Sequence, residues 1–323
     1  MSHTCHHTNY PPDSLLFLNK DCPQPALVYG TYHLIESESS LQKHKGELVS
    51  SFVNADLSLH SSSSLQFESG VFSLKNLSHI NTIITANTDG TINFVEYSED
   101  DTSLSLTNTI SVEDSMITSI ASSDLSGSIL ACTCSSGNVY VLNHSDSSSF
   151  SHLISHEFDA WCSLFFDSNT LLTGGDDAVV RVSDLRSSSQ IKLSRLHSAG
   201  VVSLSRHPSS NLILSGGYDD QLIMWDIRFP SRKVASCDMP GGVWDVVPVS
   251  GDVYGVPCMY GGCSLVEIGG KGIRQLESYN RHKSIVYGFD STLTLENKRV
   301  AATCSFYDKE IRLWEIDVLN LIN

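Results

Sequence analysis

The chain has 323 residues, of which 41% are hydrophobic and 17% are charged, and its formal net charge is −16. This charge argues against binding to nucleic acid, which needs a basic surface, and no apolar run approaches the roughly 18 residues that cross a membrane. The first residues, MSHTCHHTNYPPD, lack the apolar core of a signal peptide, so we expect a cytoplasmic protein.

The amino-terminal segment carries few structural signals. We expect residues 1–13 to form a flexible tail ahead of one domain over residues 14–323. Within that tail, HTCHH at 3–7 contains residue types that bind metals, but nothing in the sequence orients them, so we expect neither a metal nor a cofactor. The nine cysteines include no C-x-x-C pair, which predicts reduced thiols.

A short pattern recurs along the chain: an apolar strand, small residues, an acidic turn and a second strand. LLTGGDDAVVRVSDLR (171–186) and ILSGGYDDQLIMWDIR (213–228) are two copies, with Asp177 and Asp219 in their turns. A period of roughly 40–45 residues with four strands per unit is typical of a β-propeller blade. The corresponding turns elsewhere fall at Asp89, Ser136, Gly261 and Asp308.

The repeat predicts the fold class. A seventh unit fits PALVYGTYHLIE at 25–36, ahead of a serine-rich insertion near 36–64 in which we expect Ser61–Ser64 to be loop. We therefore predict an all-β, seven-bladed β-propeller of the WD-repeat type. The first strands of six blades are expected at 70–77, 116–123, 159–166, 200–207, 242–249 and 285–292.

Three blades contain side chains that look like catalytic triads. The sets are His156, Thr173 and Asp177; His197, Ser215, Asp219 and Trp225; and His282, Cys304, Asp308 and Trp314. Buried polar groups must be paired, and such a set satisfies itself inside a sheet, so we expect the three histidines to be structural. No G-x-S-x-G turn of the α/β-hydrolase type is present.

Large aromatic residues recur at matching places in the first strands. Trp244 and Tyr287 hold the same place in successive units, and Trp161 lies at or next to it. The first strands of a propeller surround its central channel, where such residues can form a cage for a quaternary ammonium group. They can instead fill the tapering core, which the sequence favours while leaving both interpretations open.

The chain resembles WD-repeat proteins over essentially its whole length, and among them the methyl esterases of diphthamide biosynthesis. The resemblance rests most specifically on PGGVWDVVPV (240–249), HKSIVYGFD (282–290) and ATCSFYDKEIRLWE (302–315), in that order. It implies a carboxylic ester hydrolase that removes a methyl group from diphthine, a modified histidine of translation elongation factor 2. That substrate carries a trimethylammonium group, which would suit the aromatic residues, and we expect the chain to act as a monomer.

The catalytic groups follow less directly from the sequence. We expect them at the channel mouth of the last two blades, where Tyr287, Ser305, Tyr307 and Asp308 lie, with His282 as the nearby general base. Activated water and a covalent Ser or Cys intermediate both stay open. The alternative function is a non-catalytic scaffold that presents its faces to protein partners, because fold alone does not assign activity.

Overall fold

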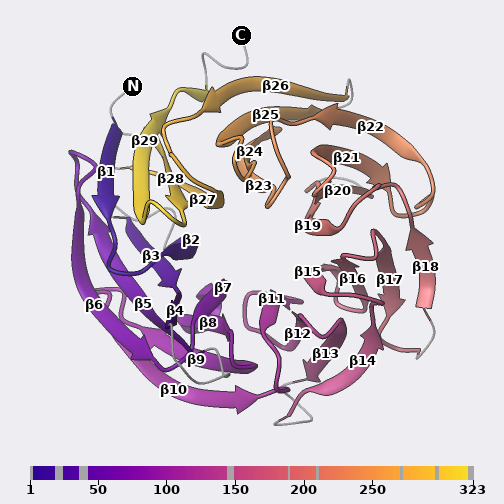
Figure 1. Cartoon of the computed structure of the whole chain (residues 1–323), viewed down its shortest axis with the longest axis horizontal. Coiled ribbons are helices and arrows are strands. Elements are labelled where there is room, and N and C mark those ends of the chain that lie inside the picture. The colour runs from indigo at the N-terminus through magenta and orange to yellow at the C-terminus, as the bar shows by residue number, and fades with distance from the viewer. Residues whose placement is uncertain are drawn as a thin grey trace. The chain divides into compact units, whose positions relative to one another are not determined.

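The computed structural model describes residues 3–18, 25–35, 43–143, 149–187, 190–208, 211–269, 272–294 and 298–318. Its strands form seven antiparallel sheets, in which successive strands along the chain pair as neighbours (Figure 1). This is the all-β, seven-bladed propeller that the repeat predicts. The sheets, numbered here as blades 1–7 by their first strands, fall into two compact units, each described by itself.

The first unit, Met1–Ile117 with His282–Asn323, contains blades 1, 2 and 7. Blade 1 consists of β2 (Pro12–Leu18), β3 (Ala26–Thr31), β5 (Lys43–Val53) and β6 (Leu59–Phe67), with β4 (His33–Ile35) paired to the start of β5. Blade 2 consists of β7 (Val71–Leu77), β8 (Thr82–Asn87), β9 (Thr91–Tyr97) and β10 (Leu104–Ser111), with a short 3-10 helix, η1 (Ser78–Ile80), after β7. Blade 7 consists of β27 (Val286–Leu293), β28 (Arg299–Ser305), β29 (Glu310–Ile316) and β1 (His3–His7).

The second unit, Thr118–Arg281, contains blades 3 to 6. Blade 3 consists of β11 (Ile117–Ser122), β12 (Ile129–Cys134), β13 (Asn138–Asn143) and β14 (Ser151–Ser155). Blade 4 consists of β15 (Ala160–Asp167), β16 (Thr170–Gly175), β17 (Val180–Asp184) and β18 (Gln190–Ser194). Blade 5 consists of β19 (Val201–Arg206), β20 (Leu212–Gly217), β21 (Gln221–Asp226) and β22 (Lys233–Asp238). Blade 6 consists of β23 (Val247–Ser250), β24 (Val253–Pro257), β25 (Cys263–Gly269) and β26 (Gly272–Tyr279).

The turn positions of the repeat have one backbone signature. The residue after each predicted turn position has positive φ, a conformation that favours Gly, Asn or Asp. These residues are Gly90, Gly137, Ala178, Asp220, Gly262 and Lys309, with φ between 55° and 86°. In six blades, the repeat therefore predicts at which residue the second hairpin turns.

The amino-terminal segment differs from the expected tail. Residues His3–His7 form β1, which pairs antiparallel with β29 and completes blade 7, so that His3 faces Trp314 and His7 faces Glu310 (Figure 1). β1 is held in place by its ladder of hydrogen bonds to β29. Without β1, the edge of β29 would leave backbone groups unsatisfied. Residues 12 and 13, also placed in the tail, belong to β2.

Two further segments differ from expectation. Ser61–Ser64 lie inside β6 rather than in a loop, because β6 pairs with β5 in a long hairpin. The first strand expected at 242–249 is regular only over Val247–Ser250. Ahead of this strand, isolated hydrogen bonds hold the backbone, such as the bond from the Trp244 N–H to the Pro257 carbonyl at 2.9 Å.

Close packing explains the paired glycines of the repeat. A Cβ atom on Gly174 would lie 2.9 Å from Cγ1 of Val201, on the first strand of the next blade. In blade 1, a Cβ on Gly30 would lie 2.5 Å from Cγ1 of Val71. Larger side chains at the end of the second strand would therefore push neighbouring blades apart.

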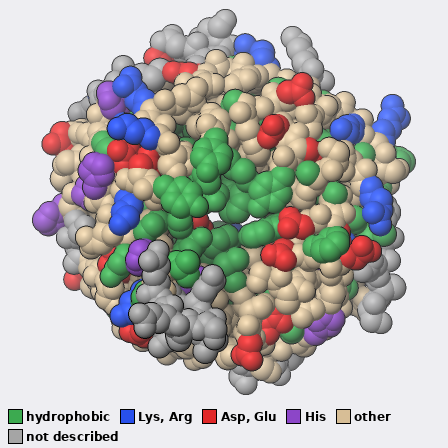
Figure 2. All heavy atoms as spheres, viewed as in Figure 1, with side chains coloured by type: hydrophobic (Ala, Val, Ile, Leu, Met, Phe, Trp, Pro, Cys, Tyr) green, Lys and Arg blue, Asp and Glu red, His purple; other side chains and the backbone are tan. Residues whose placement is uncertain are grey.

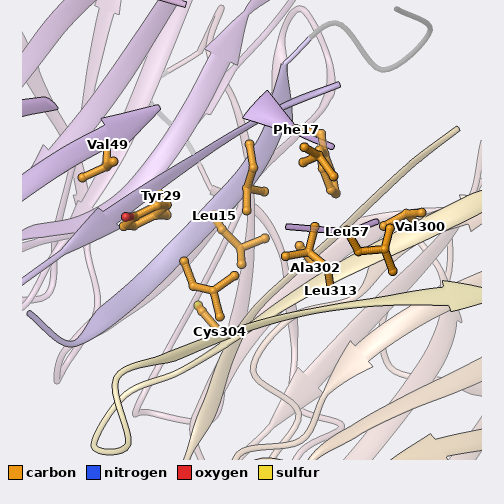
Figure 3. Close-up of a cluster of buried hydrophobic side chains, with 12 residues drawn as sticks. Leu15, Phe17, Tyr29, Val49, Leu57, Val300, Ala302, Cys304 and Leu313 are labelled. Atoms are coloured by element: carbon orange, nitrogen blue, oxygen red, sulfur yellow. The ribbon is translucent and has the colours of Figure 1, made fainter. Parts of the chain in front are cut away.

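Among the described residues of the first unit, one buried cluster of twelve side chains joins blades 1 and 7. Leu15 and Phe17 on β2 pack with Ala302 on β28 and Leu313 on β29, and all four are at least nine-tenths buried (Figure 3). Burial of a side chain of this size contributes about 1.5–3 kcal/mol. This packing fixes β2, which carries Asp13 near its start.

Blades 4 and 5 contain the expected polar networks. In blade 5, His197 Nδ1 lies 2.9 Å from Asp219 Oδ1, His197 Nε2 lies 2.8 Å from Ser215 Oγ, and the Trp225 indole donates to that oxygen at 3.1 Å. Burial lowers the pKa of His197, so the ring is neutral at pH 7. Although burial alone would raise it, bonds from His197 and from the Ser198 backbone hold the pKa of Asp219 below its usual range.

The network of blade 4 has the same histidine, hydroxyl and aspartate, but an arginine joins it and no tryptophan does. His156 lies 3.0 Å from Asp177 and 2.9 Å from Thr173, while Arg181 donates to Asp177 at 2.7 Å. In both blades the histidine uses its two ring nitrogens within the sheet. Within the described residues, no helix is long and apolar enough to span a membrane, and the cysteines are free thiols.

Removal of residues 1–7 should lower the free energy of unfolding by about 2–4 kcal/mol, because it deletes the ladder between β1 and β29. Chemical denaturation measured by tryptophan fluorescence checks this. A matched control replaces His3, Cys5 and His7 with Thr, which keeps the strand. The deletion and the control should differ; equal stabilities would mean that β1 contributes nothing.

The variant Asp219→Asn should lower the free energy of unfolding by about 1–3 kcal/mol, because the carboxylate accepts bonds that an amide cannot all replace. Its neighbour provides the control: Asp220 is exposed, has a φ of 58° that Asn tolerates, and should accept Asn within about 0.5 kcal/mol. Urea unfolding of both variants gives the comparison, and a stable Asp219→Asn would contradict a structural network.

Candidate functional site

The first strand of several blades begins with a β-bulge, an extra residue that leaves the ladder and points away from it. The pairing register shifts across one residue in each of five blades. We call this place the bulge position. Its occupants are Asp13, Phe72, Trp161, Val202 and Tyr287.

A second position lies at the same end of each of these blades. The residue that follows the second strand donates its N–H to the carbonyl of the residue before the first strand, at 2.8–3.0 Å. We call this the strand-end position. Its occupants are Tyr32, Thr88, Asp176, Tyr218 and Phe306. Each blade thus presents two side chains that the ladder does not constrain.

In the second unit, Trp161 at a bulge position, Tyr218 at a strand-end position and Trp244, ahead of β23, form a group of three aromatic rings. The ring centroids of Trp161 and Trp244 lie 6.0 Å apart, and Tyr218 lies 6.4 Å from each. The planes are inclined by 55° to 87°, so no two rings stack face to face. Tyr218 is 39% exposed and both tryptophans are half-buried, so part of each ring remains accessible.

Carboxylates border this aromatic trio (Trp161, Tyr218 and Trp244). The Trp161 indole donates to Asp176 at 2.7 Å. Burial and the neighbouring Asp159 and Asp177 raise the pKa of Asp176, and burial together with Asp176 and Asp159 raises the pKa of Tyr218. Acidic and hydrophobic side chains also lie next to one another on the face drawn in Figure 2. The surroundings of the trio are therefore electronegative and favour a cation.

In the first unit, the same positions build a second aromatic group. Tyr32 lies 4.8 Å from Phe306 and 6.2 Å from Phe72 between ring centroids, and Tyr287 lies 5.9 Å from Phe306. Tyr307 contacts the edge of Phe306 at 5.1 Å and is 69% exposed. Tyr287 thus belongs to a different aromatic group from the one that holds Trp161 and Trp244.

One carboxyl group adjoins this second group. Asp13, at the bulge position of β2, is only 3% exposed, and its Oδ1 has no hydrogen-bond partner among the described residues. Burial raises the pKa of Asp13 well above its usual range. Burial, Asp13 and Tyr307 in turn raise the pKa of Tyr32, so its hydroxyl stays protonated.

The residues proposed as catalytic lie mostly inside blade 7. The His282 side chain has no exposed surface, and its Nε2 lies 2.9 Å from Thr303 Oγ1. Ser305 is fully buried, whereas Asp308 keeps 12% of its side chain exposed. His282 Nδ1 lies 3.9 Å from Asp308 Oδ2. Although burial opposes it, the nearby His282 and Ser305 side chains and the hydrogen bond from the Lys283 N–H hold the pKa of Asp308 well below its usual range.

This arrangement resembles the networks of blades 4 and 5, with one correction. Thr303, not Cys304, is the hydroxyl-bearing partner of the histidine. The hairpin of blade 7 is one residue longer than that of blade 5: Ala301 pairs with Trp314 where Ile213 pairs with Trp225. Counting back from the turn by the spacing of blade 5 therefore gives Cys304, one residue after the true partner of the histidine, Thr303.

Two clusters contain residue types that bind metals. Ligand atoms of Cys5, His7 and Glu310 lie within 4.8 Å of one another, as do those of His282, Asp308 and Glu310. Arg312 donates to Glu310 at 2.8 Å and carries a positive charge beside both clusters. A guanidinium at this distance opposes a metal ion, and the absence of a metal site stays a prediction.

Four members of the two aromatic groups, Tyr32, Phe72, Tyr218 and Phe306, and the neighbouring Asp13 were absent from the sequence prediction. Tyr218 and Phe306 stand where Asp176 stands in the first repeat copy, so a comparison of strand ends would have found them. Asp13 and Tyr32 belong to the one blade whose first strand was not recognised. The sequence did identify Trp161 and Trp244, which the structure brings together.

Comparisons with known proteins agree with the fold and indicate a relationship. A family model described as WD domain, G-beta repeat (WD40) matches residues 189–226. A chain in a solved structure of the mitotic checkpoint complex matches with a TM-score of 0.73 and 16% identity, over 97% of this chain and 93% of that one. That likeness shows the propeller fold alone.

The sequence relatives are more specific. The Dictyostelium discoideum protein named diphthine methyltransferase homolog is 27% identical over 283 residues, which cover 77% of each chain. Proteins named diphthine methyltransferase are 31% identical over 204 residues in Schizosaccharomyces pombe and 29% identical over 162 residues in Mus musculus. These two matches cover 59% and 47% of this chain, and only 61% and 34% of the relatives. The chain is therefore a seven-bladed β-propeller with one match to the WD40 repeat, and it is similar in sequence to proteins named diphthine methyltransferase.

Proposed function

We propose that this chain hydrolyses the methyl ester of diphthine on translation elongation factor 2, releasing methanol and a carboxylate. The relationship to proteins named diphthine methyltransferase supports diphthine as the substrate class. The observation that carries the proposal is the aromatic trio Trp161, Tyr218 and Trp244 with its bordering carboxylates.

The trio suits a trimethylammonium group for a physical reason. Such a group has no N–H donor, so hydrogen bonds cannot recognise it, and aromatic faces and nearby negative charge are the remaining means. Each ring contributes about 0.5–2 kcal/mol to the binding of a desolvated cation. Asp176 adds charge attraction beside Trp161. The net charge of −16 also favours association with a partner that binds RNA through basic surfaces.

Ester hydrolysis further needs a base and a carbonyl that accepts the attacking oxygen. His282 is poorly suited to be that base, because its ring is enclosed and bonded to Thr303. Ser305 is equally enclosed, which disfavours a covalent serine intermediate. Activated water is the mechanism that this geometry supports best.

Purified chain incubated with elongation factor 2 that carries the methyl ester should release one methanol per modified histidine. The peptide with that histidine should lose the mass of one CH₂ group by mass spectrometry, with or without an added methyl donor. Binding without methanol release would favour the scaffold alternative. A mass gain that requires S-adenosylmethionine would instead indicate methyl transfer.

Alanine at Trp161, Tyr218 or Trp244 should raise KM by about 3- to 30-fold and change kcat less, because each removes one aromatic face. Phe229→Ala is the matched control, since this ring of the same unit is 62% exposed and outside the trio. A substrate peptide with a neutral tert-butyl group in place of trimethylammonium should bind wild type as weakly as the variants do. Equal affinity for both peptides would mean that the trio only packs.

A further inference from the structure

We propose that the carboxylate of Asp176 is the general base of this hydrolysis and takes a proton from the water that attacks the ester carbonyl. The inference rests on the proposed function and deepens it. Asp176 holds the strand-end position of blade 4, in the same unit as the aromatic trio. In the other four blades this position holds Tyr32, Thr88, Tyr218 or Phe306, so a carboxyl group is the exception.

The two adjacent acids of the GGDD segment have different surroundings. The Asp177 side chain is only 4% exposed, lies 3.0 Å from His156 Nδ1 and accepts Arg181 at 2.7 Å. Asp176 is exposed, and the Trp161 indole donates to its Oδ1 at 2.7 Å. No described residue donates a hydrogen bond to its Oδ2, so this oxygen is available to water. Asp176 is thus oriented by one bond and open to a reactant, unlike the enclosed side chains of blade 7.

Two observations place this carboxylate against the aromatic trio. Its bond to the Trp161 indole holds it beside one ring. A Cβ atom on Gly200 would overlap Asp176 Oδ1 and would lie 3.1 Å from Cδ2 of Tyr218, so the carboxylate and a second ring cover the same glycine. In methyl-diphthine, the ester carbonyl is bonded to the carbon that carries the trimethylammonium group. A trio that holds the cation therefore brings the carbonyl next to the acid at its border.

The electrostatic surroundings of Asp176 suit a base. Burial raises its pKa and the carboxylates of Asp159 and Asp177 raise it further, although the Trp161 indole opposes them. The raised pKa moves Asp176 toward the range in which a carboxylate accepts protons from water effectively. The trimethylammonium group of the bound ester favours the charged form. The carboxylate therefore stays deprotonated at pH 7 until water attacks.

The proposed step balances without a cofactor. The Asp176 carboxylate takes a proton from water as the water oxygen bonds to the ester carbonyl carbon, which gives a tetrahedral intermediate. The C–OCH₃ bond then breaks, and the methoxy oxygen takes the proton from Asp176 as methanol leaves. The product acid loses its own proton to solvent, and Asp176 is again a carboxylate.

Asp176→Asn tests the assignment, because the amide oxygen can still accept the Trp161 indole but cannot take a proton from water. We expect kcat on elongation factor 2 that carries the methyl ester to fall by about 10²- to 10⁴-fold, since a general base contributes that much. KM should rise by about fivefold or less, because an exposed charge contributes little to binding. The matched control is Asp220→Asn, which removes one exposed carboxylate of the same unit and should leave both constants within about threefold.

The outcomes separate the two proposals. If wild type binds substrate but releases no methanol, the proposed function fails and this inference falls with it. If wild type is active and folded Asp176→Asn changes only KM, with kcat within about threefold, the acid merely attracts the cation and only the inference is overturned.

A second variant covers the case in which Asp176→Asn does not fold. In Asp176→Ala, added formate should restore kcat by about tenfold or more, because it replaces the missing carboxylate base. A folded Asp176→Ala without rescue overturns the inference. Misfolding of both variants would make Asp176 a structural residue and overturn it as well.

Discussion

The close approach of neighbouring blades at the end of the second strand, at Gly30, Gly174 and Gly216, is the constraint on which this structure depends. Gly174 lies against Val201, and Gly30 lies against Val71, at distances that leave no room for a side chain. The backbone must then leave its regular ladder, and the extra residue of the bulge does so one position away. Because the bulged side chain is outside the ladder, its identity varies from Asp to Trp without altering the sheet. The fold thus separates residues that hold blades together from residues that are free to acquire a function.

The sequence predicted the parts of the molecule that repeat. Turn positions followed from the paired GGDD and GGYDD segments, because left-handed backbone follows the turn position in the second hairpin of six blades. The histidine networks followed for the same reason, and Trp161 and Trp244 stood out against the repeat. Cys304 was misplaced where blade 7 breaks the repeat length by one residue.

Blade 1 shows why other parts were out of reach. Its sequence lacks the acidic turn residues of the repeat, and its strand β2 begins with Pro12 and a charged residue, which suggested a tail. Its identity depends on pairing with β3 and on packing against β27 and β28, from the other end of the chain. Contacts between segments so distant in sequence leave no local pattern. Asp13 and Tyr32 were missed with it, although both hold positions that recur in other blades.

The acids of this protein divide according to what surrounds them. Asp177, Asp219 and Asp308 lie in hairpin turns, where a histidine and backbone N–H groups stabilise the charged form and lower the pKa. Asp13 and Asp176 lie at the bulge and strand-end positions, where burial among aromatic rings or beside other acids raises it. A carboxylate already satisfied by several donors gains little from a proton or a cation, whereas an unsatisfied one gains much. The histidine sets of blades 4 and 5 therefore belong to the fold, whereas the second group of acids is less constrained by it.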